Sequence, residues 1–126
     1  MNDRELLKLA QDAATRAYAP YSGFPVGAAL ECEDGAIYTG CNVENAAYGE
    51  CICAERTAVV KAVSEGRTAF RRIAVYGTGK NYCMPCGACR QVLSEFSPEL
   101  EVLSAKAGGS YVSYPLTKLM PYSFKL

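Results

Sequence analysis

The sequence predicts an α/β fold, a three-layer α/β/α arrangement built around a mixed five-stranded sheet. Five short apolar runs rich in strand-favouring residues occur along the chain, and the first two flank a tight-turn signal typical of an antiparallel hairpin. Helical patterns alternate with the later runs. Strands that alternate with helices after an opening hairpin indicate a mixed sheet that carries helices on both faces.

The first helix begins at a capping box. Asn2 is followed three residues later by Glu5, a pair that caps the first backbone N–H groups of a helix. Apolar residues then recur at helical spacing: Leu6, Leu9, Ala10, Ala13, Ala14 and Ala17. We expect this helix to end near Pro20.

The opening hairpin comprises the runs "FPVGAALECE" and "AIYTGCNVE", which lie on either side of Asp34 and Gly35. An Asp-Gly pair between two strand-like runs is the strongest short hairpin signal. A second helix is expected from about residue 53 to residue 64, with Gly66 as its C-terminal stop. The run "RRIAVYGT" then reads as a buried strand.

A third helix should be opened by Pro85 and should stop before Pro98, because proline suits the first helical position and ends a helix that precedes it. Strands at "EVLSA" and "YVSYP" follow, joined by a turn at Gly108 and Gly109. A short turn around residues 116 to 120 completes the pattern. There is no internal repeat or linker, so we expect a single domain over residues 1–126.

Composition excludes several classes of protein. Half of the 126 residues are apolar and 21% are charged, which is ordinary for a soluble globular domain. No apolar run approaches the roughly 18 residues of a membrane-spanning helix, and the start "MNDRELLKLA" lacks the layout of a signal peptide. We therefore expect a cytoplasmic protein with no membrane partner.

The charges indicate a small, uncharged ligand. Thirteen basic and thirteen acidic side chains cancel, and the pair Arg71 and Arg72 is the largest basic cluster. Nucleic-acid affinity depends mainly on basic groups that neutralise phosphates. We therefore expect no nucleic-acid partner.

The chain has seven cysteines and no histidine. Without an export signal, cysteines are more often thiols or metal ligands than disulfides, because the cytosol keeps thiols reduced. A metal must then be bound by thiolates or carboxylates, and no imidazole is available as a base.

Three of these cysteines are predicted to form a zinc site. Cys86 and Cys89 lie three residues apart at the start of the third helix, so both can reach one ion, and Cys53 lies at the start of the second helix. A helix N-terminus lowers the pKa of a thiol and favours the thiolate that zinc needs. Three protein ligands leave one tetrahedral position open, as in catalytic zinc sites.

Other uses of the cysteines remain open at this point. Cys83 also lies three residues before Cys86, but it precedes Met84 and Pro85 and should fall outside the helical turn. The role expected for it, and for Cys32, Cys41 and Cys51, is that of an incidental or buried thiol. A closed structural zinc knot would take a fourth sulfur from Cys83 or Cys51, and "CGAC" is formally a redox motif.

Glu55 and Arg56 follow Cys53 on the same helical turn. A carboxylate beside the metal can accept and return protons, although many glutamates in a first turn only complement the helix dipole. A guanidinium that donates hydrogen bonds to the thiolates would offset their excess negative charge, whereas the alternative for Arg56 is a surface arginine.

These residues carry a resemblance. The stretch "CAE" followed by "PCGAC" resembles the zinc-dependent cytidine deaminase family, and the similarity extends through "YSGFPVGAAL", "NVENAAYGECICAER" and "PCGACRQVLSEF". The set of three cysteines resembles the short, homotetrameric branch of that family. The resemblance implies one Zn²⁺ per subunit held by Cys53, Cys86 and Cys89, with Glu55 as the proton shuttle and Arg56 as charge compensation.

Substrate contacts are also implied by the resemblance. Asn42 and Glu44 match positions that bind sugar hydroxyls, and an amide with a carboxylate suits a ribose diol; loop capping is the alternative. The further matching positions are a ring near the pyrimidine at Phe24, an N–H donor to the base carbonyl at Ala54, a residue lining the sugar pocket at Tyr48, and an aromatic ring that enters a neighbouring subunit's site at Phe124. For Phe24 and Tyr48 the alternative is core packing, and for Phe124 it is a frayed tail.

The predicted function is hydrolytic deamination of cytidine and 2′-deoxycytidine to the uridines, with release of ammonia, in pyrimidine salvage. Within the enzyme class, the alternatives are another amino-heterocycle such as blasticidin S, or a base in RNA. The neutral charge disfavours RNA, and the Asn42 and Glu44 pair disfavours blasticidin S.

Overall fold

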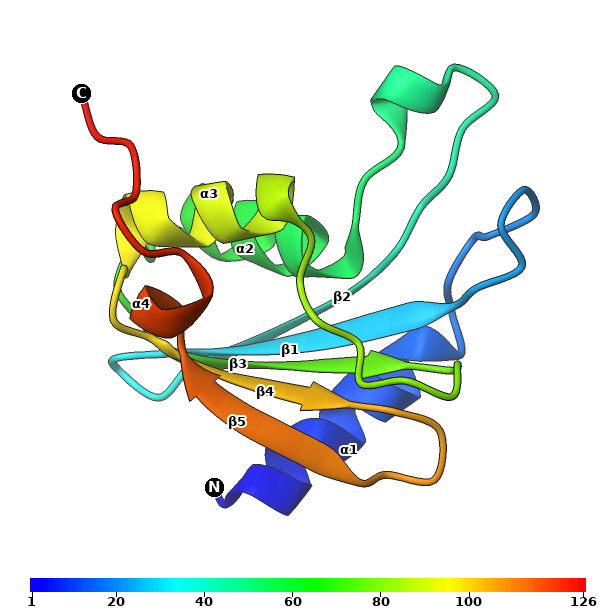
Figure 1. The fold of residues 1–126 in the computed structure, drawn as a ribbon, viewed down its shortest axis with the longest axis horizontal. Helices are drawn as coiled ribbons and strands as arrows, with labels where there is room; N and C mark the ends of the chain where they lie inside the picture. The colour runs from blue at the N-terminus through cyan, green and yellow to red at the C-terminus, as the bar shows by residue number, and fades with distance from the viewer.

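A computed structural model describes residues 1–126 and contains one five-stranded sheet with helices on both sides (Figure 1). The strands are β1 (Val26–Cys32), β2 (Ile37–Cys41), β3 (Phe70–Gly77), β4 (Glu101–Ala105) and β5 (Tyr111–Pro115). The α-helices are α1 (Asp3–Ala14), α2 (Ala54–Ser64), α3 (Gly87–Phe96) and α4 (Leu116–Leu119), and a short 3₁₀ turn, η1, covers Tyr48–Glu50.

The sheet is mixed, as the sequence predicts. Its strand order is β2-β1-β3-β4-β5, and β3 with β4 is the parallel pair, while every other pair is antiparallel. Parallel neighbours need a crossover connection, and α3 supplies it. The predicted hairpin is also confirmed, because β1 and β2 pair across a turn in which Gly35 adopts a φ of 90°.

Two apolar cores lie on opposite faces of the sheet, and they follow from the alternation of side chains along each strand. The face toward α1 carries small residues such as Ala29, Ala74 and Ala105. The other face carries larger residues, among them Leu30 and Ile73, packed against α2, α3 and α4. Each fully buried residue of this size contributes roughly 1.5–3 kcal/mol, so these two layers fix the positions of the helices.

The first helix is shorter than predicted. The capping box of Asn2 and Glu5 is present, but α1 ends at Ala14 rather than near Pro20. Arg16 and Ala17 donate to carbonyls three residues back, and the Tyr18 N–H then bonds to the Asn42 carbonyl. Pairing with a distant segment therefore ends the helix, and no proline is needed.

The third helix starts two residues later than predicted. Its N-cap is Cys86 and its first residue is Gly87, so Pro85 lies just before the cap instead of at the first helical position. The second helix matches its prediction more closely: Cys53 is the N-cap, and Gly66 follows the C-cap with a φ of 92°.

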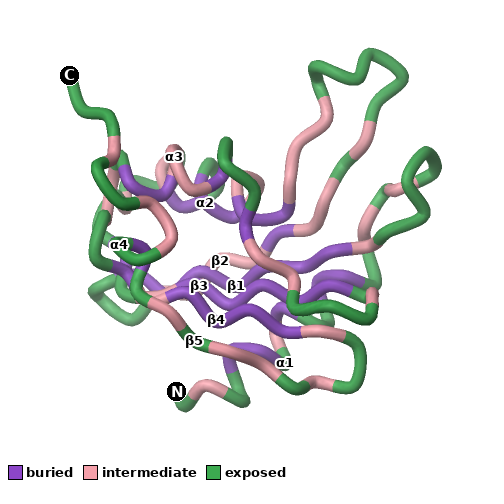
Figure 2. The backbone as a smooth tube through the Cα atoms, viewed as in Figure 1, coloured by how far each residue is buried: buried purple, intermediate pink, exposed green.

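The N-terminal ends of α2 and α3 lie above the same end of the strands, the end at which β1 begins and β3 finishes (Figure 1). Two connections, residues 15–25 and 42–53, project beyond this end and are largely exposed (Figure 2). They run side by side, because Tyr18 forms a parallel bridge with Val43. No helix combines the length and apolar character that a membrane crossing requires.

Candidate metal centre and catalytic cavity

Three cysteine sulfurs converge where α2 and α3 begin. Cys53 and Cys86 are the N-cap residues of α2 and α3, and Cys89 lies in the first turn of α3. The Sγ atoms of Cys53 and Cys86 are 3.9 Å apart, those of Cys86 and Cys89 are 3.5 Å apart, and all three lie within 4.8 Å of one another. The two helix starts thus bring together residues that are far apart in the sequence.

This sulfur arrangement fits zinc. Tetrahedral zinc with Zn–S bonds of about 2.3 Å places its sulfur ligands about 3.8 Å from one another. The two measured separations, 3.9 Å and 3.5 Å, lie close to that spacing. A set of three thiolates also suits zinc better than the hard cations magnesium and calcium, which prefer oxygen.

The cluster contains no fourth sulfur. Cys83 lies upstream of Pro85, outside α3, and its sulfur is not among the three that converge. The Cys51 Sγ instead accepts a hydrogen bond from the Asn45 N–H at 3.3 Å. Neither residue belongs to the group of converging ligands, and a closed four-sulfur knot is therefore not formed.

The pKa values of the Cys53 and Cys89 thiols are shifted in opposite directions. A hydrogen bond from Cys89 holds the pKa of Cys53 well below its usual value, and the same bond raises the pKa of Cys89. Arg56 adds to the first effect, because its Nη2 donates to the Cys53 Sγ at 3.6 Å. Arg56 is therefore not a free surface arginine: it faces the sulfur cluster and offsets its negative charge.

Glu55 is buried beside the cluster. It is only 4% exposed, and this burial is the main cause that raises the pKa of its carboxyl to about 7. A group with a pKa near neutrality can both accept and return a proton. Glu55 precedes Arg56 on the first turn of α2, so the same helix start carries a ligand, an acid–base group and a guanidinium.

The cluster opens into a cavity of about 210 Å³. Glu55, Cys53 and Cys86 form its polar wall, whereas the remaining lining residues come from the start of β1 and from the neighbouring connections. They are Ser22, Phe24, Val26, Asn42, Cys83 and Met84. No lysine or arginine lines the cavity, so it offers no side-chain cation to a phosphate group.

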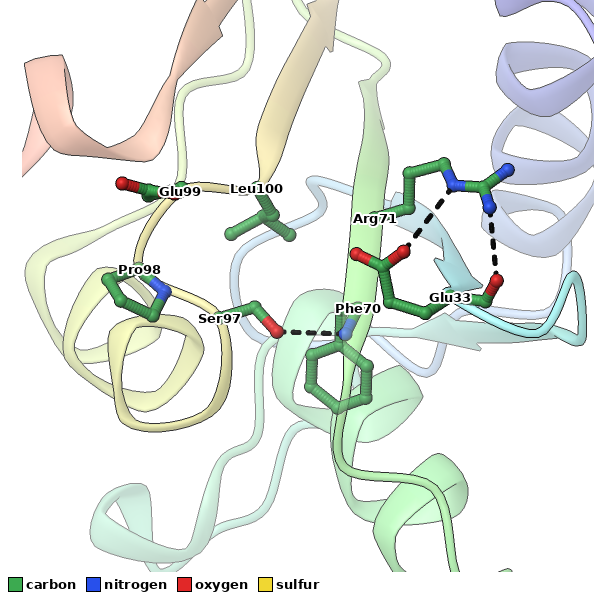
Figure 3. A pocket seen from close by; sticks show the side chains of 7 residues that line it. All are labelled: Glu33, Phe70, Arg71, Ser97, Pro98, Glu99 and Leu100. Atoms are coloured by element: carbon green, nitrogen blue, oxygen red, sulfur yellow. Dashed lines mark hydrogen bonds and ion pairs between the residues drawn. The ribbon is translucent and has the colours of Figure 1, made fainter.

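A second depression, of about 370 Å³, lies at the opposite end of β1 and β3 (Figure 3). The Arg71 and Ser97 side chains that line it already have partners within the chain. Arg71 forms an ion pair with Glu33 at 3.8 Å, and the Ser97 Oγ accepts the Phe70 N–H at 2.8 Å. Although it is larger, this depression contains no cluster that could perform chemistry.

Asn42 and Glu44 both form hydrogen bonds to the chain that leads into β1. The Asn42 Oδ1 accepts the Val26 N–H at 2.8 Å, and its Nδ2 donates to the Phe24 carbonyl at 2.9 Å. Glu44 accepts the backbone N–H groups of Tyr21 and Ser22. The loop-capping role that the sequence left as an alternative is therefore real, and only Asn42 also lines the cavity.

Comparison with known proteins now places the chain. Residues 1–104 match the model of the cytidine and deoxycytidylate deaminase zinc-binding region, a span that contains all three cysteines. The chain belongs to the cytidine and deoxycytidylate deaminase family. It is 46% identical over 125 residues to a cytidine deaminase of Sporosarcina psychrophila, covering 98% of this chain and 92% of that protein.

Other relatives agree. A probable cytidine deaminase of Dictyostelium discoideum is 47% identical over 128 residues, covering 98% of this chain and 86% of its own length. The crystal structure of a Burkholderia pseudomallei cytidine deaminase superposes with a TM-score of 0.95 at 46% identity, covering 98% of this chain and 100% of the other. The predicted fold class is thereby confirmed, and zinc is the metal that the family description assigns to this region.

The remaining residues that the family resemblance implies are spread around the cavity. Phe24 is 40% exposed and lines the cavity, so it is not a core residue. Ala54 is the first residue of α2, and its N–H has no carbonyl partner within the helix. Tyr48 packs edge-on against Tyr21 and is 73% exposed, so it is not a core residue. It does not line the cavity of its own chain.

Phe124 lies outside the cavity, and its side chain is largely exposed. Its carbonyl accepts a hydrogen bond from Gln91, and the neighbouring Lys125 Nζ donates to the Ser94 carbonyl at 2.6 Å. The tail is therefore attached to α3 through its backbone and lysine, and the aromatic ring of Phe124 remains free.

Four residues outside the site expected from the sequence also line the cavity: Ser22, Val26, Cys83 and Met84. Val26 has the pattern of an ordinary strand residue. Ser22 carries no motif of its own, and its proximity to the cysteines depends on the long-range pairing of residues 18 and 43. The position of Ser22 within "YSGFPVG", directly before a glycine and the cavity phenylalanine, was the available signal.

Proposed function

We propose that this protein is a zinc-dependent cytidine deaminase that hydrolyses cytidine and 2′-deoxycytidine to the corresponding uridines and releases ammonia. One observation carries the proposal: three thiols converge, and two of them, with a buried carboxyl whose pKa is near 7, form one wall of a cavity with no basic lining. Family membership supports the same chemistry.

Cys53, Cys86 and Cys89 are the residues that would hold the zinc ion. When bound, zinc lowers the pKa of a water molecule so that a hydroxide nucleophile is available at neutral pH. Glu55 would take one proton from the attacking water and give it to N3 of the pyrimidine. It would then take the remaining hydroxyl proton from C4 and give it to the amine, so that ammonia leaves as the C4 carbonyl forms. Arg56 keeps Cys53 as a thiolate, because its Nη2 faces that sulfur.

The substrate fits the cavity walls. Phe24 and Val26 would offer apolar surface to a flat ring. The Ala54 N–H, which has no helical partner at the start of α2, would donate to the base carbonyl. Asn42 makes two hydrogen bonds to the backbone and retains one amide hydrogen for a sugar hydroxyl. A cavity without lysine or arginine favours a nucleoside over a nucleotide, whose phosphate would call for a cation.

We extend the proposal to the domain organisation, cellular location and assembly of the protein. Residues 1–126 would form one catalytic domain acting in the cytoplasm on free nucleosides in pyrimidine salvage. Four copies would assemble, with Tyr48 and Phe124 contributing to the sugar pocket and to a neighbouring cavity. Support for assembly comes from the exposed aromatic side chains of these two residues, which pack against no core in the single chain.

The test is a substrate comparison with purified protein carrying stoichiometric zinc. Loss of ultraviolet absorbance should be fastest for cytidine and 2′-deoxycytidine, and slow or absent for deoxycytidylate, free cytosine, blasticidin S and a cytosine-containing oligonucleotide. A higher kcat/KM for any of these competitors would replace the proposed substrate class. No turnover of any compound by zinc-loaded protein would refute the enzymatic proposal itself.

A further inference from the structure

Ser22 connects two groups at the rim of the cavity. Its Oγ donates to the Glu44 Oε2 at 2.5 Å and accepts the Phe24 N–H at 3.1 Å. The Ser22 backbone N–H also donates to the Glu44 Oε1, at 3.0 Å. Ser22 itself lines the cavity, whereas Glu44 reaches it only through this serine.

The backbone conformation makes this arrangement possible. Gly23, between Ser22 and Phe24, has a φ of 64°, a left-handed conformation that glycine adopts without strain. It turns the chain so that the Phe24 N–H points back at the Ser22 hydroxyl. A residue with a side chain would resist this turn although open space surrounds the position.

Glu44, which accepts the hydrogen bond of the Ser22 hydroxyl, is also held by backbone groups. The Glu44 N–H donates to the Tyr18 carbonyl at 2.8 Å, and Glu44 accepts the Tyr21 N–H at 2.9 Å. The hydrogen bond from the Ser22 side chain is the largest of the effects that lower the pKa of the Glu44 carboxyl. Glu44 is therefore held as a carboxylate, in one orientation, by the segment that carries Phe24.

We propose that Ser22 is a positioning residue for nucleoside binding, whose hydroxyl orients the Glu44 carboxylate at the rim of the cavity. This inference rests on the proposed function, in which Phe24 lies against the base, and on the sugar contact that the family resemblance implies for Glu44. Ser22 makes no step of the chemistry, and its loss changes how well the substrate is held.

An isosteric pair of variants isolates the hydroxyl. Ser22→Thr keeps it, and Ser22→Val replaces it with a methyl group of similar shape, while the exposed position has room for both side chains. Ser22→Val should raise the KM for cytidine about tenfold with kcat within about twofold, because a hydrogen bond to a carboxylate is stronger than a neutral one. Ser22→Thr should stay within about twofold of the wild-type KM.

A control and a double mutant complete the experiment. Ser64→Ala, which removes an exposed hydroxyl that bonds the Lys61 carbonyl on α2, should leave both constants unchanged. In a Glu44→Ala background, the KM values of the Ser22→Thr and Ser22→Val variants should converge to within about twofold, because coupled residues are not additive.

Equal KM values for the two variants in the wild-type background would overturn the inference, as would a fall in kcat with KM unchanged or a difference that persists without Glu44. These outcomes are distinct from failure of the proposed function, which would appear as a wild-type protein that does not deaminate cytidine. Thermal unfolding of each variant separates a binding effect from a loss of folded protein.

Discussion

Gly40 on β2 lies against the backbone of α2, so close that a Cβ atom at this position would stand 2.6 Å from the Ala58 nitrogen and 2.7 Å from the Ala54 carbonyl oxygen. The obstacles are backbone atoms, which cannot rotate away. The start of α2, which carries Cys53 and Glu55, therefore packs directly against β2. The absence of a side chain at Gly40 determines the distance between the helix and the sheet.

Gly40→Ala should displace the start of α2. Overpacking of this kind costs about 1–3 kcal/mol of unfolding free energy. Misplacement of reacting groups by about 1 Å can cost on the order of a hundredfold in rate, so we expect kcat/KM for cytidine to fall by at least about tenfold. Chemical denaturation and steady-state kinetics would measure both effects.

Gly49→Ala is the matched control for stability, because a Cβ there meets no atom within 4 Å and the backbone φ is not positive. Its unfolding free energy should stay within about 0.5 kcal/mol of the wild type. Equal stability and activity of the Gly40 and Gly49 variants would show that α2 can move without cost.

Substitutions of the cysteines should separate ligands from neighbours. Cys86→Ser removes one of three converging sulfurs and should lower the zinc content of purified protein well below one ion per chain. Cys83→Ser should retain the full zinc content, because that thiol lies outside the cluster. Elemental analysis after dialysis measures the difference, and loss of zinc from the Cys83 variant would reassign the site.

The convergence of Cys53, Cys86 and Cys89 could be predicted from the sequence because each of them stands at the start of a helix, which is a local signal. It is harder to predict from the sequence where Phe24, Asn42 and Glu44 lie. Their positions depend on hydrogen bonds between segments about twenty residues apart, such as the bond between Tyr18 and Asn42. The same pairing ended α1 before Pro20. Side-chain bonds to a distant backbone have no local pattern, and so the role of Ser22 required the structure.

Glu55→Gln should abolish most activity and leave the metal in place. Glutamine keeps the volume of the side chain but cannot carry a proton, and general acid–base groups contribute roughly 10²–10⁴-fold to rates. We expect kcat for cytidine to fall by about a thousandfold or more, with one zinc ion still bound per chain. Glu65→Gln, an exposed residue at the other end of α2, is the control and should behave as wild type.

If Glu55→Gln instead retained wild-type turnover, proton transfer would have to be assigned to another group. If it lost zinc together with activity, the residue would be acting on the metal site rather than on protons. Measuring the zinc content and kcat of the same preparation distinguishes the three results.

Phe124 offers a test of assembly, because its ring is 66% exposed and lies outside the cavity of its own chain. If it serves a neighbouring subunit, Phe124→Ala should raise the KM for cytidine by about tenfold, the order of magnitude expected for burying an aromatic ring at a binding site. Co-expression of Phe124→Ala chains with inactive Glu55→Ala chains should then restore some sites with wild-type KM. Such a site takes Glu55 from one chain and Phe124 from its neighbour, whereas action within one chain would leave every site of the mixture defective.

Sedimentation of the active species at four times the mass of one chain would agree with the proposed tetramer, and an active monomer would contradict it.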